Sequence, residues 1–270
     1  MAVRRGSCVR ILCRAWPMSA AHKLRKALRV LASRDRRWWW ALRHGVAPSL
    51  EHLRVLSLMA PGTVVDIGAN RGQFALAVRH VFPHARIESF EPLSGPASIL
   101  RRVFAADARV RLHEMAIGPA TGGAEIHLSA RDDSSSLLPI GSEQERIFPG
   151  TAEVAVAHIE MRRLEDVLPR ADIAAPALLK LDVQGYELQA LRGCETLLDA
   201  FAWVYCECSF VELYQGQALA DEVIAWLRAR GFALLGAYNM AFDHAGRAVQ
   251  ADFLFGRGGV RGEDPSLRSG

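Results

Sequence analysis

The chain has 270 residues, of which 50% are hydrophobic and 23% are charged, and its formal net charge at pH 7 is +4. This composition is that of a globular protein with one sizeable core, and it excludes a disordered chain, a collagen-like chain and a small disulfide-held domain. Residues 1–44 hold twelve Lys and Arg and a single acid, a net charge of +11 against −7 for the remainder, so we expect no nucleic-acid partner for the whole protein.

The first predicted element is a basic helical extension over residues 1–60. Residues 22–33 place four apolar side chains on one helical face: Leu24, Ala27, Leu28 and Leu31. Such a helix, followed by three tryptophans at 38–40, either packs on the body of the protein or lies on an anionic membrane surface, and both interpretations stay open. Arginines interrupt the apolar stretch near the N-terminus, so no signal peptide is expected, and no apolar run is long enough to cross a membrane. A second short helix is expected over 50–59.

From residue 63 onward, apolar strands alternate with amphipathic helices. Strands are expected at 63–67, 86–90 and 109–117, with helices at 71–82 and 94–106 between them. Strand–helix–strand repeats at this spacing imply right-handed βαβ units and a parallel sheet.

Residues 118–150 break this alternation. A hairpin arm is expected at 121–129, and the polar segment that follows it is typical of a functional or mobile loop. The later elements expected are strands at 153–161, 177–182 and 203–209, helices at 186–200 and 221–230, a closing antiparallel pair at 232–239 and 251–257, and a flexible tail at 257–270.

The strongest local motif is VVDIGANRGQF, which joins the first strand to the first helix. It places Asp66, Gly68, Asn70 and Gly72 in one turn, where glycines let a ligand approach the backbone. The G-x-x-x-G spacing differs from that of dinucleotide folds, and a carboxylate at the strand end would repel a pyrophosphate. The turn suits S-adenosylmethionine, which carries an ammonium and a sulfonium; a purely structural β–α turn is the alternative.

The next two strand ends carry further candidates for the same ligand. Glu91 ends the second strand, 25 residues after Asp66, and an acid at this distance can accept both hydrogen bonds of a ribose diol. Met115 and Ala116 end the third strand, where an adenine ring would lie. An exposed strand-end Glu91 and a core Met115 are the alternatives.

Two acids are expected at the reacting centre. Asp182 follows the buried strand ALLKL and Glu207 lies on the next strand, so both belong to the edge where ligands of parallel sheets bind. Carboxylates there can orient or deprotonate a hydroxyl. A helix cap for Asp182 and an ion pair of Glu207 with Lys180 are the alternatives.

The sequence does not indicate a metal site. Its five cysteines form no C-x-x-C pair, which favours reduced thiols in a cytosolic protein. The scattered histidines lack metal-ligand spacing: His80, His84, His113, His127 and His158. Residues 134–136, three serines, either line the pocket or belong to a mobile loop.

Together, the segments VVDIGANRGQFA, SFEP, MAIG, SSSLL, MRRLEDVL and LLKLDVQGYELQALRGCETLL resemble the FkbM-type S-adenosylmethionine-dependent methyltransferases over roughly residues 63–255. The resemblance implies an α/β, Rossmann-like class I methyltransferase fold, with a seven-stranded, mostly parallel sheet whose last strand is antiparallel. It also implies methylation of hydroxyl oxygens on polyketides, sugars or glycans. Gln184 departs from the family pattern, because many members have Glu there, and this puts the substrate in doubt.

We therefore predict a methyltransferase domain over 61–256 that follows the helical N-terminal extension. The expected acceptor is a small molecule or a glycan, and the expected location is the cytoplasm, with the membrane surface as an option for the basic helix. A divalent metal is compatible with this chemistry but not indicated. The residues expected to bind S-adenosylmethionine are Asp66, Gly68, Asn70, Gly72, Phe74, Glu91, Pro92, Met115 and Ala116. The residues expected in the chemical step are Asp182 and Glu207.

Two other classes of function are weighed against this prediction. A non-catalytic binding or scaffold protein of the same fold is disfavoured, because a degenerate copy should have lost some of Asp66, Gly68, Glu91 and Asp182. A nucleotide-dependent oxidoreductase is opposed by the glycine spacing.

Overall fold

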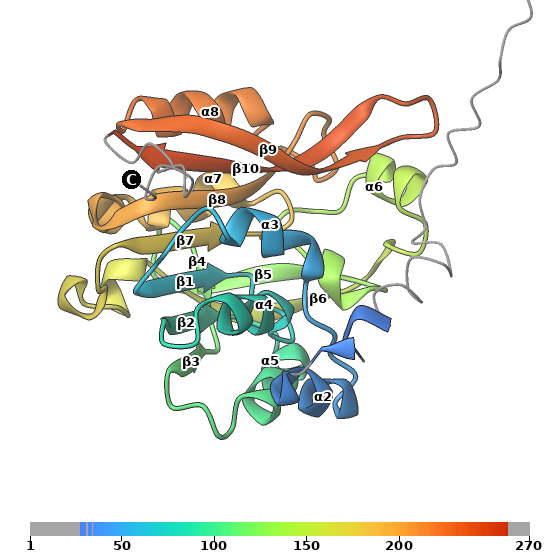
Figure 1. The fold of residues 1–270 in the computed structure, drawn as a ribbon. Coiled ribbons are helices and arrows are strands. Elements are labelled where there is room, and N and C mark those ends of the chain that lie inside the picture. Colours follow the sequence, from blue (N-terminus) through green and yellow to red (C-terminus); the bar gives the residue numbers. More distant parts are fainter. Residues whose placement is uncertain (1–27, 31, 34, 259–270) are drawn as a thin grey trace, which may run out of the picture.

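The computed structural model describes residues 28–258 except 31 and 34. A seven-stranded sheet crosses this part of the chain (Figure 1), and its strands follow the order β3-β2-β1-β7-β8-β10-β9. The strands are β1 (Thr63–Ile67), β2 (Arg86–Phe90), β3 (Val110–His113), β7 (Ala177–Leu181), β8 (Phe201–Ser209), β9 (Phe232–Phe242) and β10 (Ala248–Arg257). Neighbouring strands are parallel except that β10 runs antiparallel to both β8 and β9. The predicted mostly parallel sheet with an antiparallel last strand is confirmed.

The order of the strands fixes where a ligand can bind. The chain builds β1, β2 and β3 outward in one direction and then returns to place β7 on the other side of β1. The carboxyl ends of β1 and β7 therefore diverge at a topological switch point, which is where open α/β sheets bind ligands.

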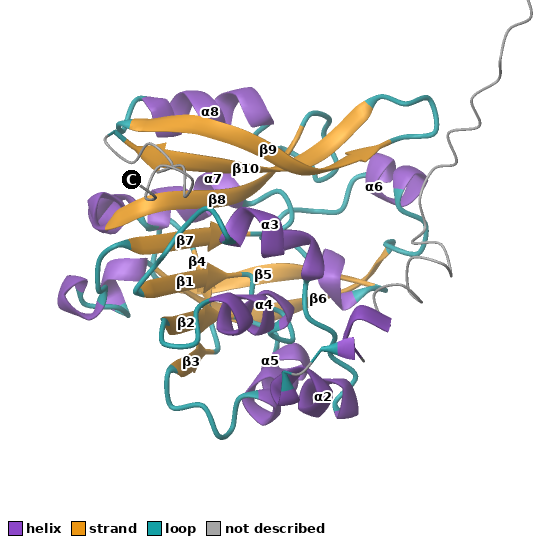
Figure 2. Cartoon of the chain, viewed as in Figure 1, coloured by secondary structure: helices purple, strands orange, loops and turns teal. Residues whose placement is uncertain are grey.

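Helices cover both faces of the sheet, with α4 in front of it and α7 behind it in Figure 2. Alternate residues of a strand point to opposite faces, so Val64 packs in the core under α4 while Val65 packs in the core under α7. The front core also takes side chains of α5 and the back core those of α8. The helices concerned are α4 (Gln73–Val81), α5 (Ser94–Val103), α7 (Glu187–Gly193) and α8 (Ala220–Arg228).

A second sheet of three strands departs from the prediction of one long strand over 109–117. That segment divides into β3 and β4 (Ala116–Ile117), and β4 joins β5 (Gly122–Ser129) and β6 (Glu153–Arg162) in the order β4-β6-β5. The expected hairpin arm is present as the antiparallel pair β5–β6. The chain breaks at residues 114–115 because β4 pairs with β6 and not with the main sheet.

The single helix predicted over 186–200 is also divided. Its α-helical part, α7, ends at Gly193, and a 3-10 helix, η5 (Glu195–Ala200), follows it. A Cβ atom on Gly193 would lie 2.2 Å from the carbonyl oxygen of Gly118, so this glycine permits close contact between α7 and the chain after β4.

The described part of the N-terminal region packs on the front core. Helix α2 (Arg36–Arg43) buries Trp38, which is 4% exposed, and leaves Trp39 and Trp40 50% and 47% exposed. The indole of Trp38 donates a hydrogen bond to the carbonyl of Leu76 on α4 (3.4 Å). The helix expected over 50–59 appears as the 3-10 turn η1 (Leu50–His52) and α3 (Leu53–Leu56).

The basic helix predicted over 22–33 and the tail predicted over 257–270 lie largely outside the described residues. Within the part of the chain that is described, every helix is too short or too polar to span a bilayer.

Candidate active site

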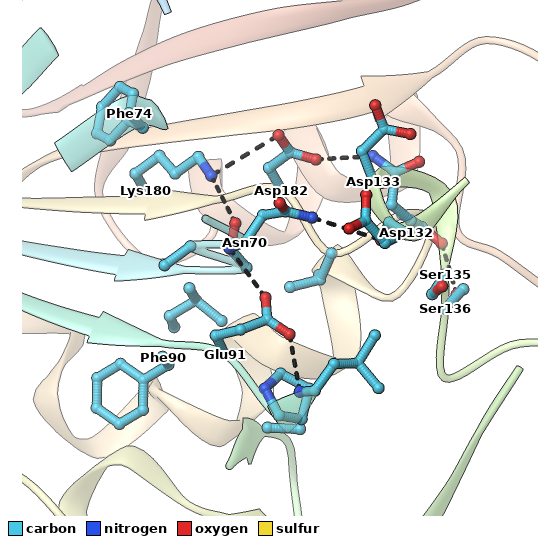
Figure 3. A pocket seen from close by; sticks show the side chains of 18 of the residues that line it. Asn70, Phe74, Phe90, Glu91, Asp132, Asp133, Ser135, Ser136, Lys180 and Asp182 are labelled. Atoms are coloured by element: carbon cyan, nitrogen blue, oxygen red, sulfur yellow. Dashed lines mark hydrogen bonds and ion pairs between the residues drawn. The ribbon is translucent and has the colours of Figure 1, made fainter. Parts of the chain in front are cut away.

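A cavity of about 400 Å³ opens beyond the carboxyl ends of β1, β2 and β7 (Figure 3). The turns after these three strands supply one part of its wall, and the segments 49–52 and 131–137 supply another. It lies at the switch point of the sheet.

The glycines of the β1–α4 turn have two different roles. Gly68 has a φ of +81°, and a Cβ there would lie 1.9 Å from the carbonyl oxygen of Asp182, so only glycine fits between the turns after β1 and β7. Gly72 has a φ of +88° and packs against the ring of Phe104, where a Cβ would lie 2.8 Å from the nearest ring atom. Of these two predicted residues, Gly68 lines the cavity and Gly72 does not.

Glu91 is the buried carboxylate at the end of β2. Its Oε2 accepts the backbone N–H of Asn70 (2.9 Å), and its Oε1 accepts that of Leu93 (2.8 Å). Burial raises the pKa of Glu91 to about 7, although these two N–H groups favour the charged form. Glu91, Asn70 and Pro92, which were expected to bind the cofactor, all line the cavity.

Asp66 lies below the cavity and does not line it. Its side chain is fully buried on the front face of the sheet, and its Oδ1 lies 3.1 Å from the Nζ of Lys180. Burial alone would lower the pKa of Lys180, but the carboxylates of Asp66 and Asp182 raise it, so the ammonium is charged. The predicted direct contact of Asp66 with a bound cation is therefore replaced by an ion pair with Lys180, which lines the cavity.

Asp182 lines the cavity, and its side chain is 37% exposed. Glu207 does not line it and is joined to Asp182 through Gln184, whose Nε2 donates to Oδ1 of Asp182 (2.8 Å) and to Oε2 of Glu207 (3.1 Å). Gln250 donates a further hydrogen bond to Glu207 (2.8 Å). Burial, together with the nearby carboxylates, raises the pKa of Glu207 well above its usual range.

These contacts correct two expectations about the acids. Lys180 pairs with Asp66 and Asp182, so the alternative of an ion pair between Lys180 and Glu207 is wrong. Glu207 stands behind Gln184 and not at the cavity wall. The amide of Gln184 can donate to both carboxylates, whereas a glutamate at this position would place three acids together.

The apolar side of the cavity contains the remaining predicted residues. Met115 and Ala116 line it together with Phe90 from the end of β2. Phe74, at the start of α4, also lines it, and the Nζ of Lys180 lies 5.4 Å from the centre of its ring. A flat apolar group bound near Glu91 would contact Phe90 and Met115.

One part of the wall was not predicted from the sequence, and a second part was left open between two interpretations. The first is the segment that contains Ser49, Glu51 and His52, which the sequence analysis assigned to the N-terminal extension. Only its position after the fold has formed shows this role, because η1 packs beside α4.

The second is the loop of residues 131–137, whose three serines were expected either to line the pocket or to belong to a mobile loop. Asp132 forms an ion pair with Arg71, and the Oγ of Ser136 donates to the carbonyl of Gln184 (2.6 Å). Asp132, Asp133, Ser135 and Ser136 point toward the cavity (Figure 3), whereas Ser134 does not line it. Of the two interpretations of the serines, the structure supports the pocket wall for two of the three.

The acids and histidines of the described residues form no group that could hold a metal ion.

Comparison with known proteins gives one family match. Residues 66–234 match the family model described as the methyltransferase FkbM domain. The chain is 31% identical over 179 residues to the 2-O-methyltransferase NoeI of Sinorhizobium fredii, an alignment that covers 62% of this chain and 72% of that protein. It is 29% identical over 226 residues to the 31-O-demethyl-FK506 methyltransferase FkbM of Streptomyces tacrolimicus (74% and 80% covered). It is 27% identical over 197 residues to the methyltransferase sdnD of Sordaria araneosa (63% and 73% covered).

Proposed function

Because this chain belongs to the FkbM methyltransferase family, we propose that its cavity binds S-adenosylmethionine and presents the methyl group to a hydroxyl oxygen of a sugar, glycan or polyketide-like acceptor. Two of its relatives are named as O-methyltransferases, which supports oxygen as the atom methylated.

The observation that carries the cofactor assignment is the environment of Glu91. Its carboxylate is buried at the cavity wall, and each oxygen accepts one backbone N–H while keeping capacity for a further hydrogen bond. Two adjacent ribose hydroxyls can donate to the two oxygens of one carboxylate. The adenine would then lie against Phe90, Met115 and Ala116, and the methionine moiety would lie toward Gly68 and Lys180.

Methyl transfer is an in-line displacement, so positioning is the main task of the site. The acceptor oxygen attacks the methyl carbon from the side opposite sulfur, at a distance of about 3 Å. Asp182 stands at the switch point and has exposed carboxylate surface, so we assign it to the chemical step, where it orients or deprotonates the acceptor hydroxyl. Glu207 acts through Gln184, which fixes the position of Asp182.

The loop of residues 131–137 supports an acceptor with several hydroxyl groups. It adds the side chains of Asp132, Asp133 and Ser135 to the cavity wall, and carboxylate and hydroxyl oxygens accept hydrogen bonds from such groups. Contact of the basic N-terminal segment with an anionic membrane surface remains a separate proposal, supported only by its charge of +11 over residues 1–44.

Calorimetric titration with S-adenosylmethionine tests the cofactor assignment. The native protein should bind, and Glu91→Ala should weaken binding by at least about tenfold, the loss expected for a charged hydrogen bond to a buried ligand. Glu143→Ala, which changes an exposed acid on α6 (Ser142–Ile147), should bind as the native protein does. Failure of the native protein to bind, or binding of NADH in its place, would contradict the proposal.

A further inference from the structure

His52, Tyr205 and Asp252 form a hydrogen-bonded row beside the cavity. His52 comes from η1, Tyr205 from β8 and Asp252 from β10. The Nδ1 of His52 lies 3.0 Å from the hydroxyl of Tyr205, and that hydroxyl lies 2.9 Å from the Oδ2 of Asp252. His52 lines the cavity and Tyr205 is 1% exposed, so the row leads from Asp252, whose side chain is 12% exposed, through a buried tyrosine to a histidine at the wall.

The partners in this row indicate which nitrogen of His52 carries the proton. Asp252 accepts hydrogen bonds from Tyr205 and from the amide of Asn239 (2.7 Å). With its own proton donated to Asp252, the oxygen of Tyr205 is left as an acceptor for Nδ1–H of His52. The Nε2 is then unprotonated, and no described residue forms a hydrogen bond with it. In this tautomer the lone pair of Nε2 has no hydrogen-bond partner among the described residues, and His52 itself lines the cavity.

Neighbouring aromatic rings hold the ring of His52 in place, in addition to its hydrogen bond with Tyr205. It packs edge-on against Phe74, with ring centres 5.3 Å apart, and against Tyr205, with ring centres 5.5 Å apart. Its side chain is only 13% exposed. A general base must be positioned before its basicity is useful, and these contacts position it.

The sheet order separates Tyr205 and Asp252 from Glu91 and Gly68, whereas His52 also contacts Phe74, which was expected to bind the cofactor. Glu91 follows β2 and Gly68 follows β1, whereas Tyr205 and Asp252 belong to β8 and β10, on the far side of β7. Asp182 follows β7 and stands between the two groups. If the cofactor occupies the side of β1 and β2, the acceptor is left with the side where His52 lies.

We propose that His52 is the general base for the acceptor hydroxyl and that Tyr205 and Asp252 are positioning residues. This proposal rests on the proposed S-adenosylmethionine-dependent O-methylation. The Nε2 of His52 takes the proton of the acceptor O–H while the oxygen forms a bond to the methyl carbon. The C–S bond breaks, its electron pair stays on sulfur, and the sulfonium becomes the neutral thioether of S-adenosylhomocysteine. The imidazolium then releases the proton to solvent.

The proposal also resolves the two options for Asp182. Its carboxylate lies 3.7 Å from the ammonium of Lys180 and accepts a hydrogen bond from Gln184. The two contacts engage different oxygens, Oδ2 and Oδ1, and so fix the orientation of the carboxylate. Asp182 therefore orients the acceptor, and His52 removes the proton.

A kinetic experiment compares His52→Ala with the native protein, using S-adenosylmethionine labelled in its methyl group and a panel of methyl glycosides and macrolide alcohols. We expect kcat to fall by about 100-fold or more, the usual contribution of a general base, while S-adenosylhomocysteine binds within about twofold of native affinity. Added imidazole should restore part of the rate of His52→Ala, because it can replace the missing base. It should restore none of the rate of Tyr205→Phe, because His52 is still present in that variant and is only poorly positioned. His84→Ala, on the exposed turn before β2, is the matched control and should behave as native. Near-native kcat in His52→Ala would overturn the proposal.

A spectroscopic experiment needs no acceptor. Nitrogen-15 NMR of histidine-labelled protein in complex with S-adenosylhomocysteine, with His52 assigned from the spectrum of His52→Gln, should show a proton on Nδ1 and none on Nε2. In the opposite tautomer, Nδ1 would accept from the amide of Asn239, 3.2 Å away, and that result would refute the assignment of the base. If the native protein bound no S-adenosylhomocysteine, the proposed function itself would fail, which is a different outcome from either result for His52.

Discussion

Glu91 combines a buried position with a pKa of about 7, and under the proposed assignment this combination should make cofactor binding sensitive to pH. Two ribose hydroxyls that donate to its carboxylate favour the charged form, so binding should be strongest above pH 7 and should weaken as the pH falls and the free protein protonates Glu91.

We expect the dissociation constant for S-adenosylmethionine to rise by up to about tenfold per pH unit below 7 in the native protein. Glu91→Gln should bind more weakly, with a shallower pH dependence, because its amide does not titrate. Calorimetry from pH 5.5 to 8 checks this. Ionisation of S-adenosylmethionine itself affects its binding to the native protein and to Glu91→Gln equally. Identical pH profiles for the two proteins would therefore show that Glu91 does not contact the ligand.

Asp182→Asn tests the role of the acid at the switch point. The substitution keeps the size of the side chain and removes its charge, so turnover should fall by about 10²-fold or more while the affinity for S-adenosylmethionine changes only a few fold. Single-turnover methyl transfer and calorimetry measure the two quantities separately. An equal loss in both would assign Asp182 to cofactor binding, and near-native turnover would make it structural.

At the scale of elements, α2 buries two residues, Trp38 and Ala41, and Trp38 has the larger side chain. Replacing it with alanine removes a buried indole and its hydrogen bond to Leu76, so the free energy of unfolding should fall by about 3 kcal/mol. Trp39→Ala, half exposed on the same helix, is the matched control and should cost less than about 1 kcal/mol. Chemical denaturation measures both, and equal losses would show that burial of Trp38 does not hold α2 in place.

Most elements could be predicted because apolar spacing fixes them locally. The strand β1 and the helix α4 follow directly from TVVDI and the apolar face of the helix. The division of residues 109–117 could not be predicted, because β4 pairs with β6, which lies more than 35 residues later in the chain.

In the candidate site, too, the contacts between residues far apart in the sequence could not be predicted. Gly68, Glu91 and Asp182 were found because each stands at the end of a strand, where the position of a side chain follows from the fold class. His52 could not be found in this way, since it reaches the cavity only when η1 packs beside α4 and meets Tyr205 and Asp252 from the other end of the chain. Asp66 has the predicted strand-end position, but the alternation of β1 turns its side chain to the front core.

At the scale of the whole molecule, the basic N-terminal region divides into two parts with different expected roles. Helix α2 packs on the core through Trp38 and Ala41, so we expect it to contribute to folding, in contrast to the segment that precedes it. The predicted domain boundary at residue 61 is untested, although Ser49 and His52, which precede it, line the cavity.

Deletion of residues 1–27 should therefore leave S-adenosylmethionine affinity unchanged, because every described residue of the cavity wall follows them. If the basic segment contacts membranes, the full chain should sediment with anionic liposomes at low salt and the truncated chain should not. Sedimentation with neutral liposomes is the control. No sedimentation of the full chain would remove the membrane proposal and leave cofactor binding unaffected.

The two sides of the cavity differ in how freely their sequences can diverge. On the side of β1 and β2, Gly68 has no room for a side chain and the oxygens of Glu91 are fixed by two backbone groups, so few substitutions are tolerated. Segment 131–137 belongs to no strand of the main sheet, and loops accept substitutions and insertions more readily, whereas segment 49–52 is constrained by the proposed base His52. On the proposed function, an enzyme of this architecture could acquire a new acceptor by remodelling this one loop while keeping its cofactor site, and exchanging the loop between two such enzymes should transfer acceptor preference.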